Sequence, residues 1–288
     1  AYRPDQVLVT AGGSEALHLV MEALVDPGDR VLVTDPGFVS YAALAAFAGG
    51  RAEGVGLDAT LHIDVERAKE QMDGARVFVL NSPANPTGAV ESEDSIRALV
   101  EYAGDRKVTV ISDEVYEHFV YEKKHVSAAR FGEDVITVNA ASKTYAMTGW
   151  RVGYLAAPED YIPECLKIHQ YAQACATSIS QYAALAAYTG DQEPVARMRE
   201  EYRARRDLLD LDGDEREPVR AREARRDLVA EVRGQRGHDA DALAHVVARR
   251  APRSSPGRSA AADHQPGCGA QGSRCTHRLP SFRDPFDP

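Results

Sequence analysis

The chain has 288 residues, a hydrophobic fraction of 44% and a formal net charge of −10. This length and composition allow one large α/β domain or two smaller domains with a sizeable core. The acidic balance argues against nucleic acid and anionic membranes as partners, and no apolar run reaches the roughly 18 residues of a membrane-spanning helix.

Seven short runs rich in apolar and β-branched residues lie between Pro4 and Ala157, and helical patterns separate several of them. This alternation predicts an α/β fold, a three-layer sandwich around a mostly parallel, seven-stranded sheet. In such sheets, ligands bind at the carboxyl ends of the strands. The predicted strands are Val7–Thr10, Val31–Thr34, Ala52–Leu57, Val77–Leu80, Val108–Ser112, Val135–Asn139 and Arg151–Ala156.

Helical periodicity is clear in Ser14–Val25, where Ser14 is a candidate N-cap and Pro27-Gly28 marks the end. Glu91–Gly104 is a second predicted helix, with apolar residues on one face. Two further helical stretches are expected, the second of them charged, at Ile162–Ala187 and Pro194–Leu209.

Composition changes sharply near residue 205. Residues 1–204 contain 18 Lys and Arg and 30 Asp and Glu, which leaves 16 and 14 of the chain's 34 and 44 for residues 205–288. Every Tyr, Trp, Ile, Lys, Asn and Met lies in the first segment. Residues 1–206 are therefore expected to form one domain, and residues 207–288 an aberrant region of low order, a small domain that is degenerate or disordered. A shifted reading frame is the preferred interpretation of the second segment, and a basic tail or a linker are the alternatives.

The four cysteines show no CxxC motif and no metal-like spacing with histidine, so no metal site is expected. Free thiols are typical of a cytoplasmic protein. The first residues also lack the basic and then apolar pattern of a secretory leader. The sequence thus predicts a cytoplasmic location.

Polar signals follow the predicted strands. In residues 10–16, two glycines form a turn and Ser14 opens a helix, whose free backbone N–H groups could bind an anion, although glycine turns before helices are common. Phe38 follows another strand and could stack on a flat ring or simply cover the sheet edge. Residues 81–88 contain two asparagines and two prolines that fix a loop, and an Asn side chain could donate a hydrogen bond there, or the segment could be a plain turn.

Four charged or phenolic side chains complete the set. Asp113 follows four apolar strand residues and needs a cationic partner or several donors, unless it caps a helix. Tyr116, three residues later, can share its side of the site. Lys143 stands at the end of a strand expected to be buried, where an ammonium loses its proton readily and the amine can form a Schiff base with an aldehyde; a surface lysine is the alternative. Arg151, eight residues on, can bind a phosphate.

One ligand uses all of these signals. A phosphorylated pyridine aldehyde needs a lysine for its aldehyde, a carboxylate for its ring nitrogen and donors for its phenolic oxygen. It also needs a flat group against its ring and an anion site for its phosphate. Pyridoxal 5′-phosphate makes these demands, and the chain meets each of them at a strand end.

The sequence also resembles the class I/II aminotransferases of the fold-type I pyridoxal-phosphate superfamily, near the aspartate and aromatic aminotransferase branch. The resemblance covers roughly residues 2–206. Its motifs, in chain order, are GlyGlySerGluAla, AsnProThrGly, SerAspGluValTyr and SerLysThrTyrAlaMetThrGlyTrpArgValGlyTyr.

The resemblance implies roles for individual residues. Lys143 is the catalytic residue, which holds the cofactor covalently and later moves a proton. Asp113 pairs with the pyridine nitrogen, and Phe38 stacks on the ring. Asn85 and Tyr116 hydrogen-bond the phenolic oxygen. Four residues are expected at or near the phosphate: Gly13, Ser14, Ser142 and Arg151.

The chain also departs from the family pattern. The serine that commonly stands three residues before the lysine is Ala140 here, while Ser142 is kept. The family's amino-terminal segment is expected to be missing, so the large domain is interpreted as truncated at its start. The motif with the arginine that binds the substrate carboxylate has no match after Arg206.

The predicted activity is transamination between an amino acid and a 2-oxo acid, in a homodimer as is usual in the family. Two alternatives stay open. The chain could be a catalytically impaired remnant that binds the cofactor without turnover, or it could carry out another reaction of the same cofactor, such as β-elimination or decarboxylation. For this chain, impaired activity is expected.

Overall fold

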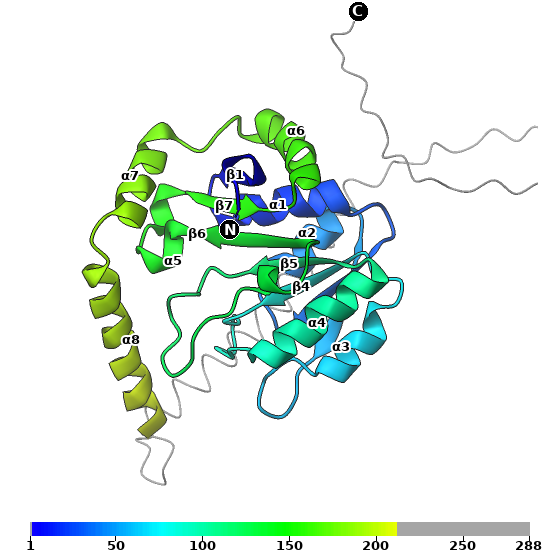
Figure 1. Ribbon diagram of the computed structural model, residues 1–288, viewed down its shortest axis with the longest axis horizontal. Helices are drawn as coiled ribbons and strands as arrows, with labels where there is room; N and C mark the ends of the chain where they lie inside the picture. Colours follow the sequence, from blue (N-terminus) through cyan, green and yellow to red (C-terminus); the bar gives the residue numbers. More distant parts are fainter. Residues whose placement is uncertain (1, 212–288) are drawn as a thin grey trace, which may run out of the picture. The chain divides into compact units, whose positions relative to one another are not determined.

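The computed structural model describes residues 2–211, with side chains to residue 207. Most of the region predicted to be aberrant, 207–288, lies outside the described residues. The described part is a sheet of seven strands with helices on both faces (Figure 1). The strands lie in the order β1-β7-β6-β5-β4-β2-β3. Their bounds are β1 Val7–Thr10, β2 Arg30–Asp35, β3 Arg51–Gly56, β4 Val77–Asn81, β5 Thr109–Asp113, β6 Val135–Ala140 and β7 Gly153–Ala156.

The prediction of a mostly parallel α/β sheet is confirmed. Strands β3, β2, β4, β5 and β6 pair in parallel, and β7 pairs antiparallel with both β6 and β1. Gly153, the first residue of β7, pairs with Thr10 at the end of β1 and with Ala140 at the end of β6. The carboxyl ends of β1, β4, β5 and β6 and the start of β7 therefore meet along one edge of the sheet.

Alternation along the strands divides the core into two layers. In β4, Val77 and Val79 belong to one buried cluster, and Phe78 and Leu80 belong to the other. A strand with apolar side chains on both faces must be covered on both faces. The first cluster packs under α1 (Gly13–Leu24), α2 (Ser40–Phe47) and α6 (Ile162–Ala172), and the second under α3 (Val65–Met72) and α4 (Glu93–Arg106).

Two helix predictions need correction. The first helix begins at Gly13, with Gly12 as its N-cap, so Ser14 lies inside the first turn and is not the cap. The stretch predicted as one helix from Ile162 to Ala187 is two helices, α6 and α7 (Ser178–Thr189). Ala174, which lies between the two helices, has a left-handed backbone conformation with φ 65°. The sequence between the helices contains no glycine or proline that would have predicted this break.

The remaining helices are the short α5 (Ala141–Thr144), which follows β6 directly, and the charged α8 (Glu193–Leu211). In α4, the hydroxyl of Ser92 accepts a hydrogen bond from the Ser95 N–H, which satisfies a free donor of the first turn. Among the described residues, no helix is long and apolar enough to cross a lipid bilayer.

Candidate functional site

A cavity of about 190 Å³ opens at the edge where the strand ends meet. It is lined by all of the residues predicted for the site: Gly13, Ser14, Phe38, Asn85, Asp113, Tyr116, Ser142, Lys143 and Arg151. Six further residues line it that the sequence did not single out for the site: Leu17, Tyr41, Asn81, Val115, Ala140 and Thr148. The fold thus brings together residues that are up to 138 positions apart in the chain, counted from Gly13 to Arg151.

A tight turn between β1 and α1 forms one wall of the cavity. Gly12 has φ 87°, and its N–H donates to the carbonyl of Thr10 at 2.8 Å. The guanidinium of Arg151 lies against this turn, because its Nη2 donates to the carbonyl of Ala11 at 3.2 Å. A side chain on Gly12 would place its Cβ 2.5 Å from that Nη2, so the end of the arginine would have to move aside. The free N–H groups of the α1 terminus and a guanidinium together are suited to bind an anion.

A buried carboxylate forms another wall. Asp113 ends β5 and is 5% exposed. Its Oδ2 accepts a hydrogen bond from the hydroxyl of Tyr41 at 2.8 Å, and its Oδ1 accepts one from the N–H of Val115 at 3.2 Å. Burial raises the pKa of Asp113 to about 6, against the lowering effects of these two hydrogen bonds and of the Lys143 ammonium. A cationic ring nitrogen placed against Asp113 would stabilise its ionised form.

Lys143 lies in α5, one turn beyond the end of β6. Its Nζ is 5.6 Å from the centre of the Tyr116 ring. The strand before Lys143 is buried as expected, but the short helix lifts Lys143 off the strand end and its side chain is exposed. The amine is therefore accessible from the cavity and from solvent.

Asn81 holds the loop that carries Asn85. The side-chain amide of Asn81 donates to the carbonyl of Asp113 at 3.0 Å, and its Oδ1 accepts from the N–H of Asn85 at 2.8 Å. The two Asn residues of the motif therefore differ in position. Asn81 is buried and joins the loop to β5, whereas Asn85 is only half-buried and lines the cavity.

Sequence reasoning missed Tyr41, although it lies in a segment that was singled out for Phe38. The two rings pack edge to face, with centroids 5.5 Å apart and an interplanar angle of 82°. Tyr41 comes three residues after Phe38 and lies in the first turn of α2. That spacing is the only signal in the sequence, since the hydrogen bond joins residues that are 72 positions apart.

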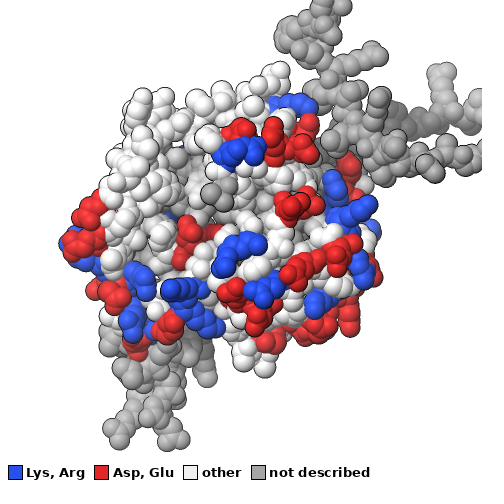
Figure 2. Space-filling model, in the orientation of Figure 1, with Lys and Arg blue, Asp and Glu red and all other residues white. Residues whose placement is uncertain are grey.

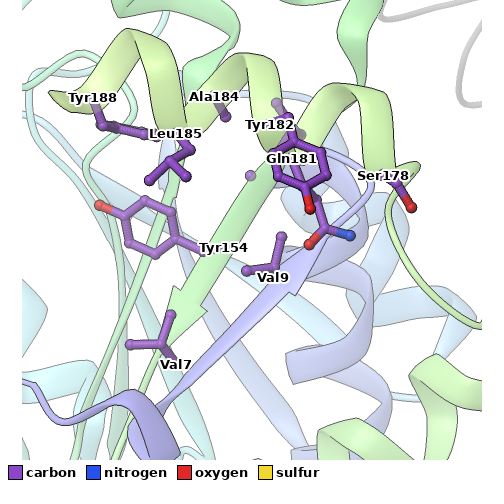
Figure 3. Close-up of a pocket in the computed structure, with 11 residues that line it drawn as sticks. Val7, Val9, Tyr154, Ser178, Gln181, Tyr182, Ala184, Leu185 and Tyr188 are labelled. Atoms are coloured by element: carbon purple, nitrogen blue, oxygen red, sulfur yellow. The ribbon is translucent and has the colours of Figure 1, made fainter. Parts of the chain in front are cut away.

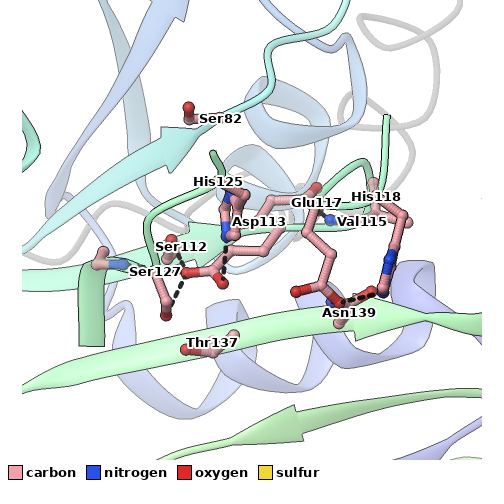
Figure 4. Close-up of polar contacts among 12 residues, drawn as sticks. Ser82, Ser112, Asp113, Val115, Glu117, His118, His125, Ser127, Thr137 and Asn139 are labelled. Carbon is pink, nitrogen blue, oxygen red and sulfur yellow. Dashed lines mark hydrogen bonds and ion pairs between the residues drawn. The ribbon is translucent and has the colours of Figure 1, made fainter. Parts of the chain in front are cut away.

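A second polar network holds the loop that carries Tyr116 (Figure 4). Glu114 is buried, and its Oε1 accepts hydrogen bonds from the hydroxyls of Ser112 and Ser127, both at 2.9 Å. Its Oε2 lies 3.0 Å from Nε2 of His125. Glu117 accepts a bond from the side chain of Asn139 at 2.7 Å. Because Glu114 contacts both ends of the loop, it limits how far Tyr116 can move.

Comparison with known proteins places the chain in a family. Residues 1–212 match the model of the family described as aminotransferase class I and II. The chain therefore belongs to the class I and II aminotransferases.

Two named relatives show the extent of the similarity. The chain is 46% identical over 212 residues to a probable aspartate aminotransferase of Methanocaldococcus jannaschii, an alignment that covers 71% of this chain and 56% of the relative. It is 38% identical over 213 residues to the aspartate/prephenate aminotransferase of Thermus thermophilus, an alignment that covers 72% of this chain and 55% of the relative. The chain thus spans a little over half the length of these relatives.

Solved structures agree with the fold. A mutant aspartate aminotransferase of Thermus thermophilus superposes with a TM-score of 0.72 at 38% identity, covering 73% of this chain and 60% of that one. An aromatic aminotransferase of Pyrococcus horikoshii gives a TM-score of 0.70 at 37% identity, with 72% and 58% covered.

Proposed function

We propose that this chain binds pyridoxal 5′-phosphate and takes part in transamination between an amino acid and a 2-oxo acid. We assign cofactor binding to residues 1–206 as the large domain of the enzyme. The observation that carries the proposal is the meeting of the Asp113 carboxylate, the Lys143 amine and the α1 terminus with Arg151 at one cavity.

The chemistry of these groups fits the proposed cofactor. Asp113 is buried with a raised pKa, so a cation beside it is favourable, and a protonated pyridine nitrogen is such a cation. The space beside Gly12 is already filled by Arg151, which sets a guanidinium next to the helix terminus that would receive a phosphate. Phe38 is half-buried at the cavity and offers an aromatic surface to a ring.

Each residue has a proposed task. Lys143 would hold the cofactor through its amine, and the same amine, when free, would take up and return the proton at the substrate Cα. Tyr41 orients the Asp113 carboxylate through its 2.8 Å hydrogen bond. Asn85 and Tyr116 donate hydrogen bonds to the phenolic oxygen, and Ser142 lies near the phosphate. When bound, the cofactor supplies the electron sink that makes the Cα proton acidic.

The relatives suggest where to look for the substrate. Those compared here are named for aspartate, for aspartate and prephenate, or for aromatic amino acids. Aspartate with 2-oxoglutarate is therefore the first pair to test, followed by the aromatic amino acids.

The proposal is tested by absorbance. The 288-residue chain mixed with pyridoxal 5′-phosphate is expected to develop the absorbance band of a lysine-linked cofactor, and Lys143→Ala is expected to lose it. Lys167→Ala is the matched control, because Lys167 is an exposed lysine that pairs with Glu164 on α6 at 2.8 Å. Aspartate should then convert the cofactor to its amine form, and 2-oxoglutarate should restore it with production of glutamate. Absence of the band in the unsubstituted chain would overturn the proposal, and a band that no amino acid changes would overturn its transamination part.

We further propose that the protein is a cytoplasmic homodimer. The described residues include two free cysteines, buried Cys165 and exposed Cys175, as is usual in a reducing compartment. The helix α7 carries no charged residue, and the surface over it is uncharged in Figure 2, whereas charges gather over α3 and α4.

This uncharged surface supports the dimer. Tyr182 and Leu185 of α7 are 75% and 58% exposed, and with Val7, Val9 and Tyr154 they line an apolar groove of about 480 Å³ (Figure 3). Exposed apolar surface of this kind favours a protein contact. Light scattering at several protein concentrations tests the assembly, and a strictly monomeric chain would contradict it.

A further inference from the structure

The first turn of α1 contains a carboxylate that reaches back to the turn before the helix. Glu15 accepts a hydrogen bond at its Oε2 from the backbone N–H of Ala11. Its own N–H donates to the carbonyl of Gly12 at 3.2 Å. A glutamate at the third position of a helix commonly caps the free N–H groups before it in this way. Glu15 therefore fixes residues 11–13 from the helix side.

A residue from a distant helix holds Glu15 in turn. Nδ1 of His169, on α6, lies 2.9 Å from Oε1 of Glu15, although 154 positions separate the two residues. The side chains of His169 and Glu15 are only 4% and 12% exposed. With a proton on Nδ1, the imidazole donates to the carboxylate, and a buried hydrogen bond to a charged group of this kind is expensive to lose.

The backbone of Ala11 is thus held on two sides. Its N–H binds Glu15, and its carbonyl accepts the hydrogen bond from Arg151 at 3.2 Å. The same Arg151 and the next residues, Gly13 and Ser14, are the groups that line the cavity. A shift of the Ala11 backbone would therefore move both the guanidinium of Arg151 and the N–H groups at the start of α1.

The charge of Glu15 gives the pair a second task. The positive end of a helix dipole attracts a carboxylate and a phosphate alike, and two anions at one helix terminus repel each other. Both carboxylate oxygens of Glu15 already have partners, the N–H of Ala11 and Nδ1 of His169. The carboxylate is therefore held away from the N–H groups of Gly13 and Ser14, and it does not compete with a phosphate for them.

We propose that Glu15 and His169 are positioning residues that hold the turn of residues 11–14 in the geometry that binds the phosphate of the cofactor, so that packing of α6 controls cofactor affinity. This inference rests on the function proposed above, and it adds a role for two residues outside the cavity. Neither residue lines the cavity. Their effect passes through Ala11 to Arg151 and the start of α1.

The test compares two ligands that differ only in the phosphate. In the 288-residue chain, His169→Leu removes the donor while it keeps an apolar side chain in the buried site. We expect its Kd for pyridoxal 5′-phosphate to rise roughly tenfold, as for the loss of a buried hydrogen bond to a charged group. Its Kd for pyridoxal, which lacks the phosphate, should stay within about twofold of the unsubstituted chain, since the pair acts on the phosphate site alone.

Two further variants serve as controls. His169→Asn keeps an N–H donor near the position of Nδ1 and should recover most of the affinity. His18→Leu removes a half-exposed histidine from α1, the helix that carries Glu15, and it should change neither Kd, because the partner of His18 is Glu22, 4.0 Å away. If His169→Leu fails to fold, as judged by circular dichroism, Glu15→Gln probes the same contact from the other side with the same expected selectivity.

The outcomes separate the inference from the function on which it rests. If the unsubstituted chain binds no pyridoxal 5′-phosphate, both are overturned. If it binds the cofactor but His169→Leu and Glu15→Gln weaken pyridoxal and its phosphate by the same factor, or weaken neither, the proposed function stands and the positioning role is overturned.

Discussion

The buried carboxylate of Asp113 makes a prediction about stability as well as about binding. Asp113 titrates at about 6 in the folded chain, against its ordinary value of 3.8, because burial disfavours its charged form. A carboxyl with a raised pKa holds its proton more tightly in the folded state than in the unfolded state. Its contribution to stability is therefore fully present below pH 3.8 and is lost as the pH rises through about 6.

The size of the effect follows from the shift. The two pKa values differ by about 2 units, which corresponds to about 3 kcal/mol of unfolding free energy lost above pH 7. Between pH 5 and pH 7 the change is about 1.4 kcal/mol, because part of the loss has already occurred at pH 5. Asp113→Asn has no such proton, and it keeps an oxygen that can accept the hydrogen bond of Tyr41.

The assay is urea unfolding of the cofactor-free chain and of Asp113→Asn at several pH values from 5 to 8. The variant is expected to become more stable relative to the unsubstituted chain as the pH rises, by about 1.4 kcal/mol between pH 5 and pH 7. Comparing the two proteins at each pH cancels the titration of every other group. Asp113→Asn should also bind pyridoxal 5′-phosphate more weakly, since its amide cannot pair with a protonated nitrogen. A difference in stability that stays constant from pH 5 to pH 8 would refute the reasoning.

Two further substitutions test neighbouring parts of the site. Tyr41→Phe removes the 2.8 Å hydrogen bond to Asp113 and should lower the free energy of urea unfolding at pH 7 by about 1–3 kcal/mol. Tyr145→Phe is the control, because it loses only an exposed hydrogen bond to Gln192 and should change this free energy little. Equal effects of the two substitutions would contradict the role of Tyr41. Gly12→Ala adds strain at φ 87° and forces Arg151 aside, so both stability and cofactor affinity should fall, the former by about 1–3 kcal/mol. Gly28→Ala carries similar strain at φ 95° with no atom within 4 Å, so unfolding and Kd measurements should show lost stability with unchanged affinity; a comparable loss of affinity in Gly28→Ala would contradict the steric argument.

The sequence predicted the strands well because most of them are short runs rich in apolar and β-branched residues. All seven predicted strands are present, most with bounds shifted by one or two residues. It predicted nine of the fifteen residues that line the cavity, because several of them follow parallel strands whose carboxyl ends lie along one edge of the sheet. Local patterns failed where the backbone changed direction without a glycine or proline, as at Ala174 between α6 and α7.

The hydrogen-bond partners of the site could not be predicted in this way. Tyr41 reaches Asp113 across 72 positions, Asn81 reaches it across 32, and His169 reaches Glu15 across 154. Each contact depends on how helices dock on the sheet, which periodicity does not specify. The sequence left open whether Lys143 is exposed, because its exposure depends on a helix of four residues between β6 and β7.

The antiparallel strand β7 explains why Arg151 lies close to Gly12 and Gly13 in the fold although it is far from them in the sequence. An all-parallel sheet would start β7 at the opposite edge, and Arg151, two residues before Gly153, would then lie away from the strand ends. Here β7 runs against both neighbours, so its first residue pairs with Thr10 and Ala140, and a Cβ on Gly153 would lie 2.7 Å from the backbone of Gly12 and Gly13. The close approach requires glycine at position 153, and it brings Arg151 to the Ala11 carbonyl. The reversed strand is therefore the element that adds a cation to the terminus of α1.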